Sequence, residues 1–329
     1  MYILYMTFRV KNLIANIPCR SHKVDPNLLD PIGIINVNDT IWTSNAVSSD
    51  ISNYDLGGNK ILNVSVRSDE TGNLFPTSLI YNKNSKYVNN CGEAPLLIIS
   101  TLGGFDDAGT IEGYFPKKKF VETITLYKST DNASYRGLTM VKGFIYAADF
   151  FNRKIDVLGP YNFNLNNNFS FKDDTIPADY SPYNITHIKN KIYILYAKQQ
   201  EDDANRDVLG IGHGYVNIFD LQGNFIKRLI SNGNLNSPWG LIKAPTEFGF
   251  PKKTILISNF GDGKINAYNK KGKFINTLKK LNYYSHIKKV NDIVNEGIRG
   301  LVKINDSVYF ASAPELGING IIGKIIKNN

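Results

Sequence analysis

The sequence predicts an all-β fold, and more closely a six-bladed β-propeller whose ring is closed by the N-terminal strand joining the last blade. Strand patterns recur along the 329 residues in a constant order. Their spacing of roughly 45–60 residues suits four-stranded blades with loops of variable length. Gly and Asn turn signals separate the patterns. No long stretch has the apolar spacing of an amphipathic helix, which disfavours a helical fold.

The clearest repeat covers residues 237–278. It combines an apolar inner strand (SPWGLI), a second strand (KTILISN), a Gly turn and a hairpin with its tip at 269–272. The same hairpin tip recurs at 54–59 and at 219–224. Six segments that lead into inner strands follow in order, and their centres are Gly33, Ser78, Gly137, Asn184, Gly240 and Gly300. They predict six blades in one domain over residues 1–329.

The last blade is short in the sequence. Only residues 301–329 follow its centre at Gly300, which leaves room for about three strands. Residues 5–15, approximately, have no blade of their own, so we predict that they supply the missing strand and close the ring. Residues 281–295 are expected to form a short helix or a long loop. The polar segments 162–175 and 199–212 are expected to form loops at blade edges.

Composition and the N-terminus bound the class of protein. With 42% hydrophobic residues the chain can build a sizeable core, and a net charge of +9 permits an acidic partner without naming one. No run approaches the roughly 18 apolar residues of a membrane span, so we expect none. The N-terminus lacks the features of a secretory signal, so we expect an intracellular location or, for a viral protein, the virus particle. Cys19 and Cys91 are expected to be unpaired thiols.

Longer motifs add a family resemblance. The letters SPWGL at 237–241 and ILISNFGDGKINAY at 255–268 resemble the NHL-repeat class of six-bladed propellers. Over roughly residues 8–326 the chain is similar to a family of uncharacterised bacterial propellers that are usually predicted to be exported. Motifs such as DPNLLDPIGI at 25–34 and IYAADFFNRKIDV at 145–157 carry this similarity. The chain departs from that family in lacking an export signal and in its wealth of Asn, Lys and Ile, which suits an AT-rich host or a large DNA virus. The resemblance implies a fold and no reaction.

The first candidate site lies where the inner strands begin. The residues just before the six centres are Ile32, Thr77, Arg136, Tyr183, Trp239 and Arg299. Arg136 and Arg299 are three blades apart, so they would face each other across the axis of a closed ring. Tyr183 and Trp239 occupy the two blades between them. Guanidinium groups beside aromatic faces can hold an anionic, partly planar ligand. The alternative is that these four side chains pack against neighbouring blades.

The second candidate site lies on the same face, where the second strands end. Asn45, Asp149 and Asn259 stand there, and propeller-shaped calcium-dependent lactonases hold their ion near the axis with such oxygens. Ca²⁺ takes about six to eight oxygen ligands, whereas these residues carry only one formal charge among them. The alternative is that they cap tight turns. We therefore expect no cofactor and retain Ca²⁺ at these residues as a rival hypothesis.

A binding or structural role is favoured over catalysis. The sequence contains no HExxH, GxSxG, Walker or CxxC motif. Lysine pairs such as Lys270 and Lys271 lie mostly at turns and could meet phosphate backbones. Most Tyr and Phe fall at strand positions, however, which disfavours nucleic-acid binding. We predict a non-enzymatic module that recognises a protein partner or an anionic small ligand through its axial face. The alternatives are a lactonase-type hydrolase, an RNA-binding propeller and a component of a virion or cell surface.

Overall fold

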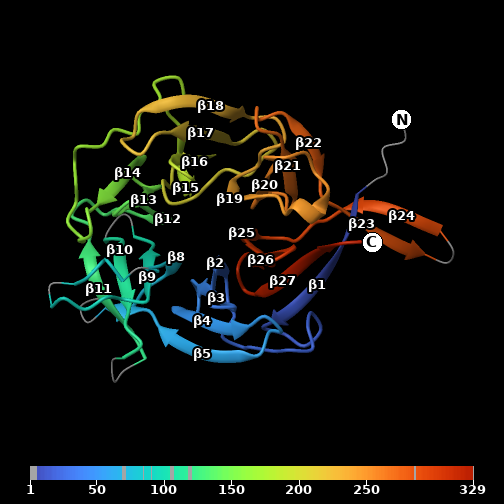
Figure 1. Cartoon of the computed structure of the whole chain (residues 1–329), viewed down its shortest axis with the longest axis horizontal. Coiled ribbons are helices and arrows are strands. Elements are labelled where there is room, and N and C mark those ends of the chain that lie inside the picture. Colours follow the sequence, from blue (N-terminus) through green and yellow to red (C-terminus); the bar gives the residue numbers. More distant parts are fainter. Residues whose placement is uncertain are drawn as a thin grey trace.

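Six antiparallel sheets stand around one axis as the blades of a propeller, which confirms the predicted fold class (Figure 1). The computed structural model describes residues 6–68, 72–83, 85–89, 91–103, 107–117, 121–284 and 287–328. Among these residues the one helical element is the short 3-10 turn η1 (Thr246–Phe248). The described residues include no helix with the length and apolar character needed to cross a membrane. Cys19 and Cys91 are exposed free thiols, as expected.

The strands of each blade follow one another outward from the axis. The inner strands contain the six centres and are β2 (Pro31–Val37), β8 (Pro76–Tyr81), β12 (Tyr135–Val141), β15 (Tyr180–Ile188), β19 (Pro238–Lys243) and β25 (Ile298–Ile304). The second strands are β3 (Thr40–Asn45), β9 (Leu97–Thr101), β13 (Phe144–Asp149), β16 (Lys191–Lys198), β20 (Ile255–Asn259) and β26 (Ser307–Ser312). The third strands are β4 (Asp50–Asp55), β10 (Thr110–Tyr114), β14 (Lys154–Leu158), β17 (Tyr215–Phe219), β21 (Ile265–Tyr268) and β27 (Ile321–Lys327). The outer strands of blades 1, 2, 4 and 5 are β5 (Lys60–Ser65), β11 (Thr123–Lys128), β18 (Phe225–Ser231) and β22 (Phe274–Thr277).

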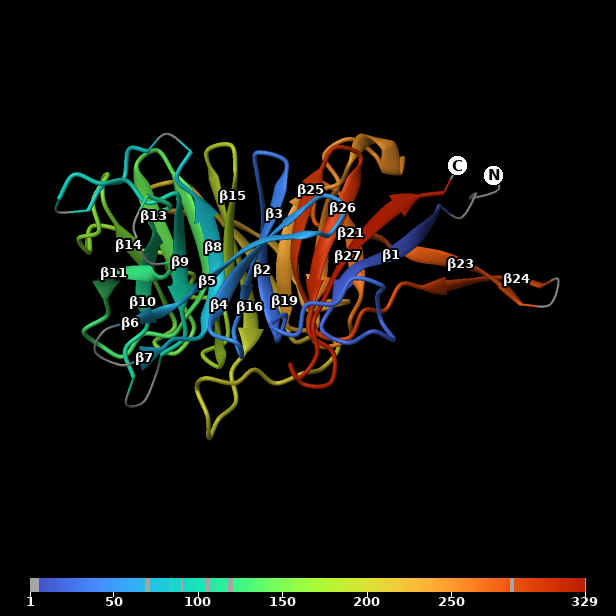
Figure 2. The ribbon, with the colours of Figure 1, turned by 90° about the horizontal axis from the view of Figure 1, so that it is seen from below.

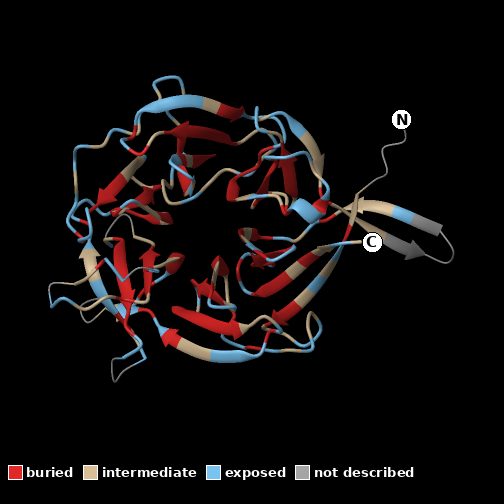
Figure 3. Cartoon of the chain, in the orientation of Figure 1, coloured by how far each residue is buried: buried red, intermediate tan, exposed pale blue. Residues whose placement is uncertain are grey.

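Burial is greatest in the middle strands of the blades and least in their outer strands (Figure 3). Strands β9 and β17 are buried at every position, whereas most residues of β18 are exposed. A middle strand is covered on both faces by the neighbouring blades, so it reads as a continuous apolar or small-residue run, such as LIIST, without strict alternation.

The three recurring hairpin tips have the same local cap. Asp55 Oδ1 accepts hydrogen bonds from the backbone N–H groups of Gly57 at 2.9 Å and Asn59 at 2.8 Å. Asp220 and Asn269 make the same pair of bonds in blades 4 and 5. Asx side chains favour this geometry in turns, which explains why the tips are visible in the sequence.

Glycine at an inner-strand centre lets neighbouring blades approach closely. A Cβ atom added at Gly300 would lie 2.6 Å from the Ile32 carbonyl oxygen of blade 1. One added at Gly240 would lie 2.6 Å from the Arg299 carbonyl oxygen of blade 6. Ser258 Oγ bridges the latter pair, accepting from Gly240 N at 2.8 Å and donating to Arg299 O at 2.5 Å. These contacts hold the backbone of the residues that precede the centres.

Gly300→Ala is therefore expected to destabilise the ring by about 1–3 kcal/mol, the usual cost of an extra methyl group in a packed site. Gly57→Ala is the control, because its Cβ would meet first the side-chain oxygen of Asp55 at 3.2 Å. The free energy of unfolding of both variants, measured in urea, tests whether the close approach of the neighbouring blade requires glycine at position 300. Equal stability of the two would contradict it.

The N-terminal strand β1 (Thr7–Ala15) occupies the fourth place in blade 6, as the sequence predicts. It runs antiparallel to β27, with Phe8 opposite Lys327 and Ala15 opposite Ile321. The register shifts at Leu13, and this bulge allows Leu13 and Ile14 both to be buried. The start of the expected strand, residue 5, lies outside the described residues.

The expected helix or loop over residues 281–295 is wrong. β23 (Lys279–Tyr284) and β24 (Ile287–Asp292) form an antiparallel hairpin that projects from the ring (Figures 1 and 2). β23 begins parallel to β1, pairing with Thr7 and Phe8. The edge of β1 that faces away from β27 has free backbone hydrogen-bonding groups at its start, and β23 pairs with them there. Residues 279–292 contain Tyr, Ile and Val, which favour strands. The turn of the hairpin, residues 285–286, lies outside the described residues.

Blade 3 has three strands, because the Asn-rich segment 162–175 forms none. A single bridge between Leu158 and Leu165 stands where a fourth strand would pair. The segment is a loop, as the sequence predicts. Strands β6 (Arg67–Ser68) and β7 (Gly72–Asn73) form a small separate ribbon.

Candidate functional site

An apolar cluster lies at the axis on one face of the ring. Its buried members are Ile32, Ala46, Phe150, Tyr183, Ala197 and Trp239. They precede the inner-strand centres or lie at or just after the ends of second strands, the positions that the sequence places on one face. Residues of blades 1, 3, 4 and 5 can form one cluster only by meeting at the axis. Tyr183 and Trp239 thus lie in one cluster, where they pack against neighbouring residues. Their role in binding a ligand stays a prediction.

Arg136 and Tyr183 contact each other beside this cluster. The guanidinium carbon of Arg136 lies 6.0 Å from the centre of the Tyr183 ring and 5.5 Å from that of the Phe150 ring. A cation is attracted to aromatic faces at such distances. Burial raises the pKa of Tyr183, and Asp207 adds to this effect, while Arg136 and Arg299 oppose it. The neutral Tyr183 hydroxyl donates a hydrogen bond to Asp207 Oδ1 at 3.1 Å.

Arg299, the fourth predicted ligand residue, is held by an ion pair. One of its guanidinium nitrogens lies 2.6 Å from Asp30 Oδ1, and the two side chains are only 13% and 16% exposed. Its guanidinium carbon lies 4.2 Å from the centre of the Phe260 ring. Burial lowers the pKa of Arg299, but Asp30, together with Tyr183 and Asp207, raises it above its usual value, so the group stays charged. Arg136, in contrast, has no ion pair within the described part of the chain.

The segment 199–213 lies over this face, seen in yellow below the ring in Figure 2. Gln199 Nε2 donates to the Phe150 carbonyl oxygen at 2.5 Å and to the Ala204 carbonyl oxygen at 2.9 Å. The Arg136 guanidinium donates to the Asn205 carbonyl oxygen. The segment is a loop, as expected, but it covers the axial residues as well as the edge of blade 4.

Three buried polar atoms, one of Arg136 and two of this loop, have no hydrogen-bond partner among the described residues. They are Arg136 Nε, Asn205 Oδ1 and Asp207 Oδ2. Leaving such a group unpaired costs about 1–3 kcal/mol. One donor and two acceptors are therefore available in the same small region.

The three predicted metal ligands lie in blades 1, 3 and 5. Asn45 Nδ2 donates to Asp50 Oδ1 at 2.6 Å, and Asn259 Nδ2 donates to the Asn234 carbonyl oxygen at 2.7 Å. The Oδ1 atoms of Asn45 and Asn259 are buried without a partner among the described residues, but they belong to different blades. These local bonds favour turn capping. Ca²⁺ at Asn45, Asp149 and Asn259 stays a prediction.

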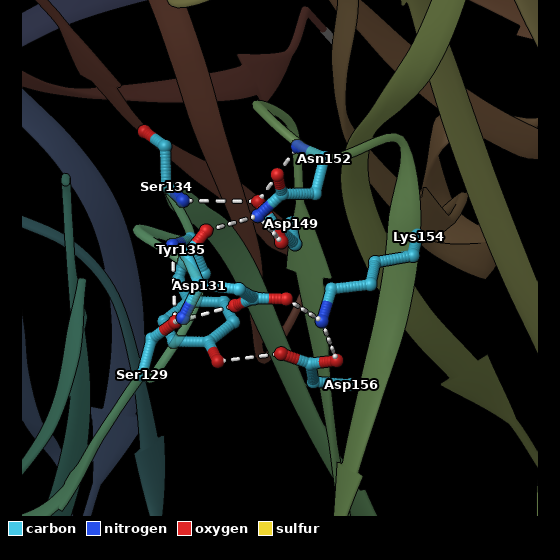
Figure 4. Close-up of polar contacts among 9 residues, drawn as sticks. Ser129, Asp131, Ser134, Tyr135, Asp149, Asn152, Lys154 and Asp156 are labelled. Atoms are coloured by element: carbon cyan, nitrogen blue, oxygen red, sulfur yellow. Dashed lines mark hydrogen bonds and ion pairs between the residues drawn. The ribbon is translucent and has the colours of Figure 1, made fainter. Parts of the chain in front are cut away.

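Asp149 belongs to an acidic group within blade 3 (Figure 4). Carboxylate oxygens of Asp131, Asp149 and Asp156 lie within 4.8 Å of one another. Lys154 Nζ lies 2.6 Å from Asp131 Oδ2 and 2.8 Å from Asp156 Oδ1, and Tyr135 donates to Asp156 Oδ2 at 2.6 Å. Burial would lower the pKa of Lys154, but its hydrogen bonds to the two aspartates raise it. The Lys154 ammonium is thus the cation that this group already holds.

Sequence reasoning missed Asp30, Asn205 and Asp207. Asp30 directly precedes the first inner strand, on the face where Arg299 was expected, so the sequence did offer it as an acidic partner for that arginine. No pattern marks Asn205 and Asp207, because they lie in a loop whose path depends on contacts with blade 3. The Lys154–Asp156 pair could have been predicted from the sequence, since residues two apart in a strand share a face.

Solved structures with the same fold include enzymes of different chemistry. The α-L-arabinofuranosidase Arb93A of Fusarium graminearum is 14% identical, with a TM-score of 0.62, and the match covers 97% of this chain and 98% of that one. Virginiamycin B lyase of Staphylococcus aureus is 12% identical, with a TM-score of 0.53, over 97% of this chain and 99% of that one. Identities this low show the fold alone.

Viral proteins are similar over nearly the whole sequence. The uncharacterised protein R648 of Acanthamoeba polyphaga mimivirus is 32% identical over 98% of this chain and 81% of its own length. The uncharacterised protein L690 of the same virus is 32% identical over 98% of this chain and 86% of its length. No protein-family model matches the chain. The chain belongs to the same family as the uncharacterised proteins R648 and L690 of this mimivirus.

Proposed function

We propose that the protein is a non-enzymatic binding module that holds an anionic group at the axis of the ring. The group belongs to a free small ligand or to a side chain of a protein partner. The observation that carries the proposal is the set of unpartnered buried atoms Arg136 Nε, Asn205 Oδ1 and Asp207 Oδ2 beside Tyr183.

The chemistry of these atoms describes the ligand. Arg136 has a positive charge without a carboxylate partner among the described residues, and its Nε–H can donate to an anionic oxygen. Asn205 Oδ1 and Asp207 Oδ2 accept hydrogen bonds, so the ligand also carries hydroxyl or amino groups close to its anionic group. The charge of Arg299 is already balanced by Asp30, so Arg136 is the principal anion-binding residue. Tyr183 and Trp239 provide the aromatic wall.

Glycerate, gluconate and glutamate have this chemistry and serve as probes. At a concentration about 100 times its Kd, a bound probe stabilises the folded state by about 2.7 kcal/mol, which raises the melting temperature. Arg136→Gln is expected to abolish the rise, and Arg9→Gln, an exposed arginine on β1, to preserve it. A panel without any stabilising member, or an equal response of Arg136→Gln, would refute the axial site. The same melting experiment with added Ca²⁺ in place of the organic probes tests the rival metal hypothesis.

The proposal extends the resemblance noted in the sequence. We propose that the blades are NHL-like repeats related to those of the exported bacterial propellers. The structural similarity to an arabinofuranosidase and a lyase leaves catalysis as the alternative, and the same axial region would be its place.

A further inference from the structure

A pocket of about 480 Å³ lies between blades 4 and 5, on the face opposite the axial site. Turns that join inner strands to second strands, and third strands to outer strands, form this face. Figure 2 shows the two faces as the upper and lower edges of the ring. The sequence does not reveal the pocket, because five separate segments converge on it.

Five lysines line it, and we call it the lysine pocket: Lys189, Lys191, Lys243, Lys253 and Lys270. All five are exposed, and none has an ion pair with a described residue. No aspartate or glutamate is among the lining residues. Like charges gathered without counter-charges repel one another, so an anion bound among them would relieve this repulsion.

The floor of the lysine pocket is apolar. Leu229 and Ile255 are buried members of the core between the two blades, and Ile188 and Tyr193 pack against that core while remaining partly accessible. A floor of aliphatic side chains and one aromatic ring suits a flat apolar group better than a fully hydrated ion.

The size of the lysine pocket favours a small molecule over a nucleic-acid strand. Its volume is within the usual range of about 300–1,000 Å³ for small-molecule sites. Single-stranded nucleic acids, in contrast, follow extended grooves with several stacking aromatic side chains. Tyr193 is the one aromatic residue that lines this pocket.

We propose that the lysine pocket binds a small molecule with several phosphate groups and a flat apolar part, the chemical class of nucleoside di- and triphosphates. The ammonium groups at the rim contact the phosphates, and the base packs on the floor beside Tyr193. The site is separate from the axial site and does not depend on the function proposed there.

Isothermal titration calorimetry of the full chain with ATP in Mg²⁺-free buffer tests the proposal. Wild-type protein is expected to bind one ATP, with an affinity that falls as salt rises. The triple variant Lys189→Asn, Lys243→Gln, Lys253→Asn is expected to bind it about tenfold more weakly or worse, because three charge–phosphate contacts are lost. Lys189 has a positive φ of 57°, which asparagine also adopts. Asn38 and Asn305 stand at the equivalent turn positions of blades 1 and 6 with φ of 48° and 51°, so Lys189→Asn is expected to preserve the turn.

The matched control removes the same charge elsewhere. Lys142→Asn, Lys172→Gln, Lys303→Gln changes three exposed lysines outside the pocket and is expected to change the affinity by less than about twofold. Lack of saturable ATP binding, or an equal loss in the control, would overturn the proposal. Inorganic tripolyphosphate is expected to bind more weakly than ATP, and equal affinity would refute the role of the floor. Tighter binding of a single-stranded RNA, lost in the triple variant, would assign the lysine pocket to nucleic acid instead.

Discussion

A chain without residues 1–15 is expected to lose its cooperative unfolding transition and to aggregate. The deletion removes β1 from blade 6, with the buried side chains of Phe8, Leu13 and Ile14. These side chains belong to two hydrophobic cores, one shared with blade 5 and one with blade 1. It also leaves β27 as an unpaired edge, and such edges pair with other copies of the chain. Thermal melting by circular dichroism and size-exclusion chromatography measure the two effects.

Point variants separate packing from the loss of a whole strand. Ile14 is 1% exposed, so Ile14→Ala is expected to cost about 2–5 kcal/mol of unfolding free energy, through lost burial and the cavity left behind. Arg9 is exposed on the same strand and keeps its backbone pairing with Ile326, so Arg9→Ala should stay within about 0.5 kcal/mol. A truncated chain that melts like the full chain would show that β1 does not hold the ring closed.

Asp30→Asn is expected to destabilise the protein by about 3 kcal/mol, because it leaves the Arg299 guanidinium charged and largely buried without its partner. The ion pair joins blade 6 to the segment that leads into blade 1, so the loss acts at the junction of the first and last blades. Urea unfolding at neutral pH measures the free energy of unfolding.

The double variant Asp30→Asn, Arg299→Met completes a thermodynamic cycle. It should be more stable than the sum of the two single effects indicates, because it removes both charges together. The exposed pair of Lys198 and Asp179, 35% and 48% exposed, is the control, and Asp179→Asn should cost less than about 1 kcal/mol. Additive effects at Asp30 and Arg299 would mean that the two charges do not stabilise each other.

Local patterns made the fold predictable. The capped tips that begin at Asp55, Asp220 and Asn269 are each held by side-chain bonds within five residues, so sequence alone locates them. The glycines at inner-strand centres are recognisable for a similar reason, since the close approach of a neighbouring backbone makes a larger residue costly at Gly240 and Gly300. The missing strand of blade 6 followed from counting strands, and β1 occupies that place.

The candidate site was predictable only in part. The repeat put Arg136, Tyr183, Trp239 and Arg299 at equivalent positions, and the structure brings Tyr183 and Trp239 into one axial cluster. The repeat in the sequence did not reveal that Arg299 is already paired with Asp30 or that Asn205 accepts a hydrogen bond from Arg136. Those partners are 269 and 69 residues away along the chain, and no local pattern encodes a contact of that length.

Residue periodicity, turn chemistry and repeat spacing thus established the all-β class, the number of blades and the strand that completes the last one. These features depend on contacts between neighbouring residues or between equivalent positions of one repeat. The tertiary structure alone decided the path of the loop 199–213, the strand character of β23 and β24, and the meeting of five lysines between blades 4 and 5. Each of these features results from packing and hydrogen bonding between segments that are distant in the sequence. Many alternative pairings of such segments differ little in free energy, so the whole fold selects the arrangement in which all the contacts are compatible.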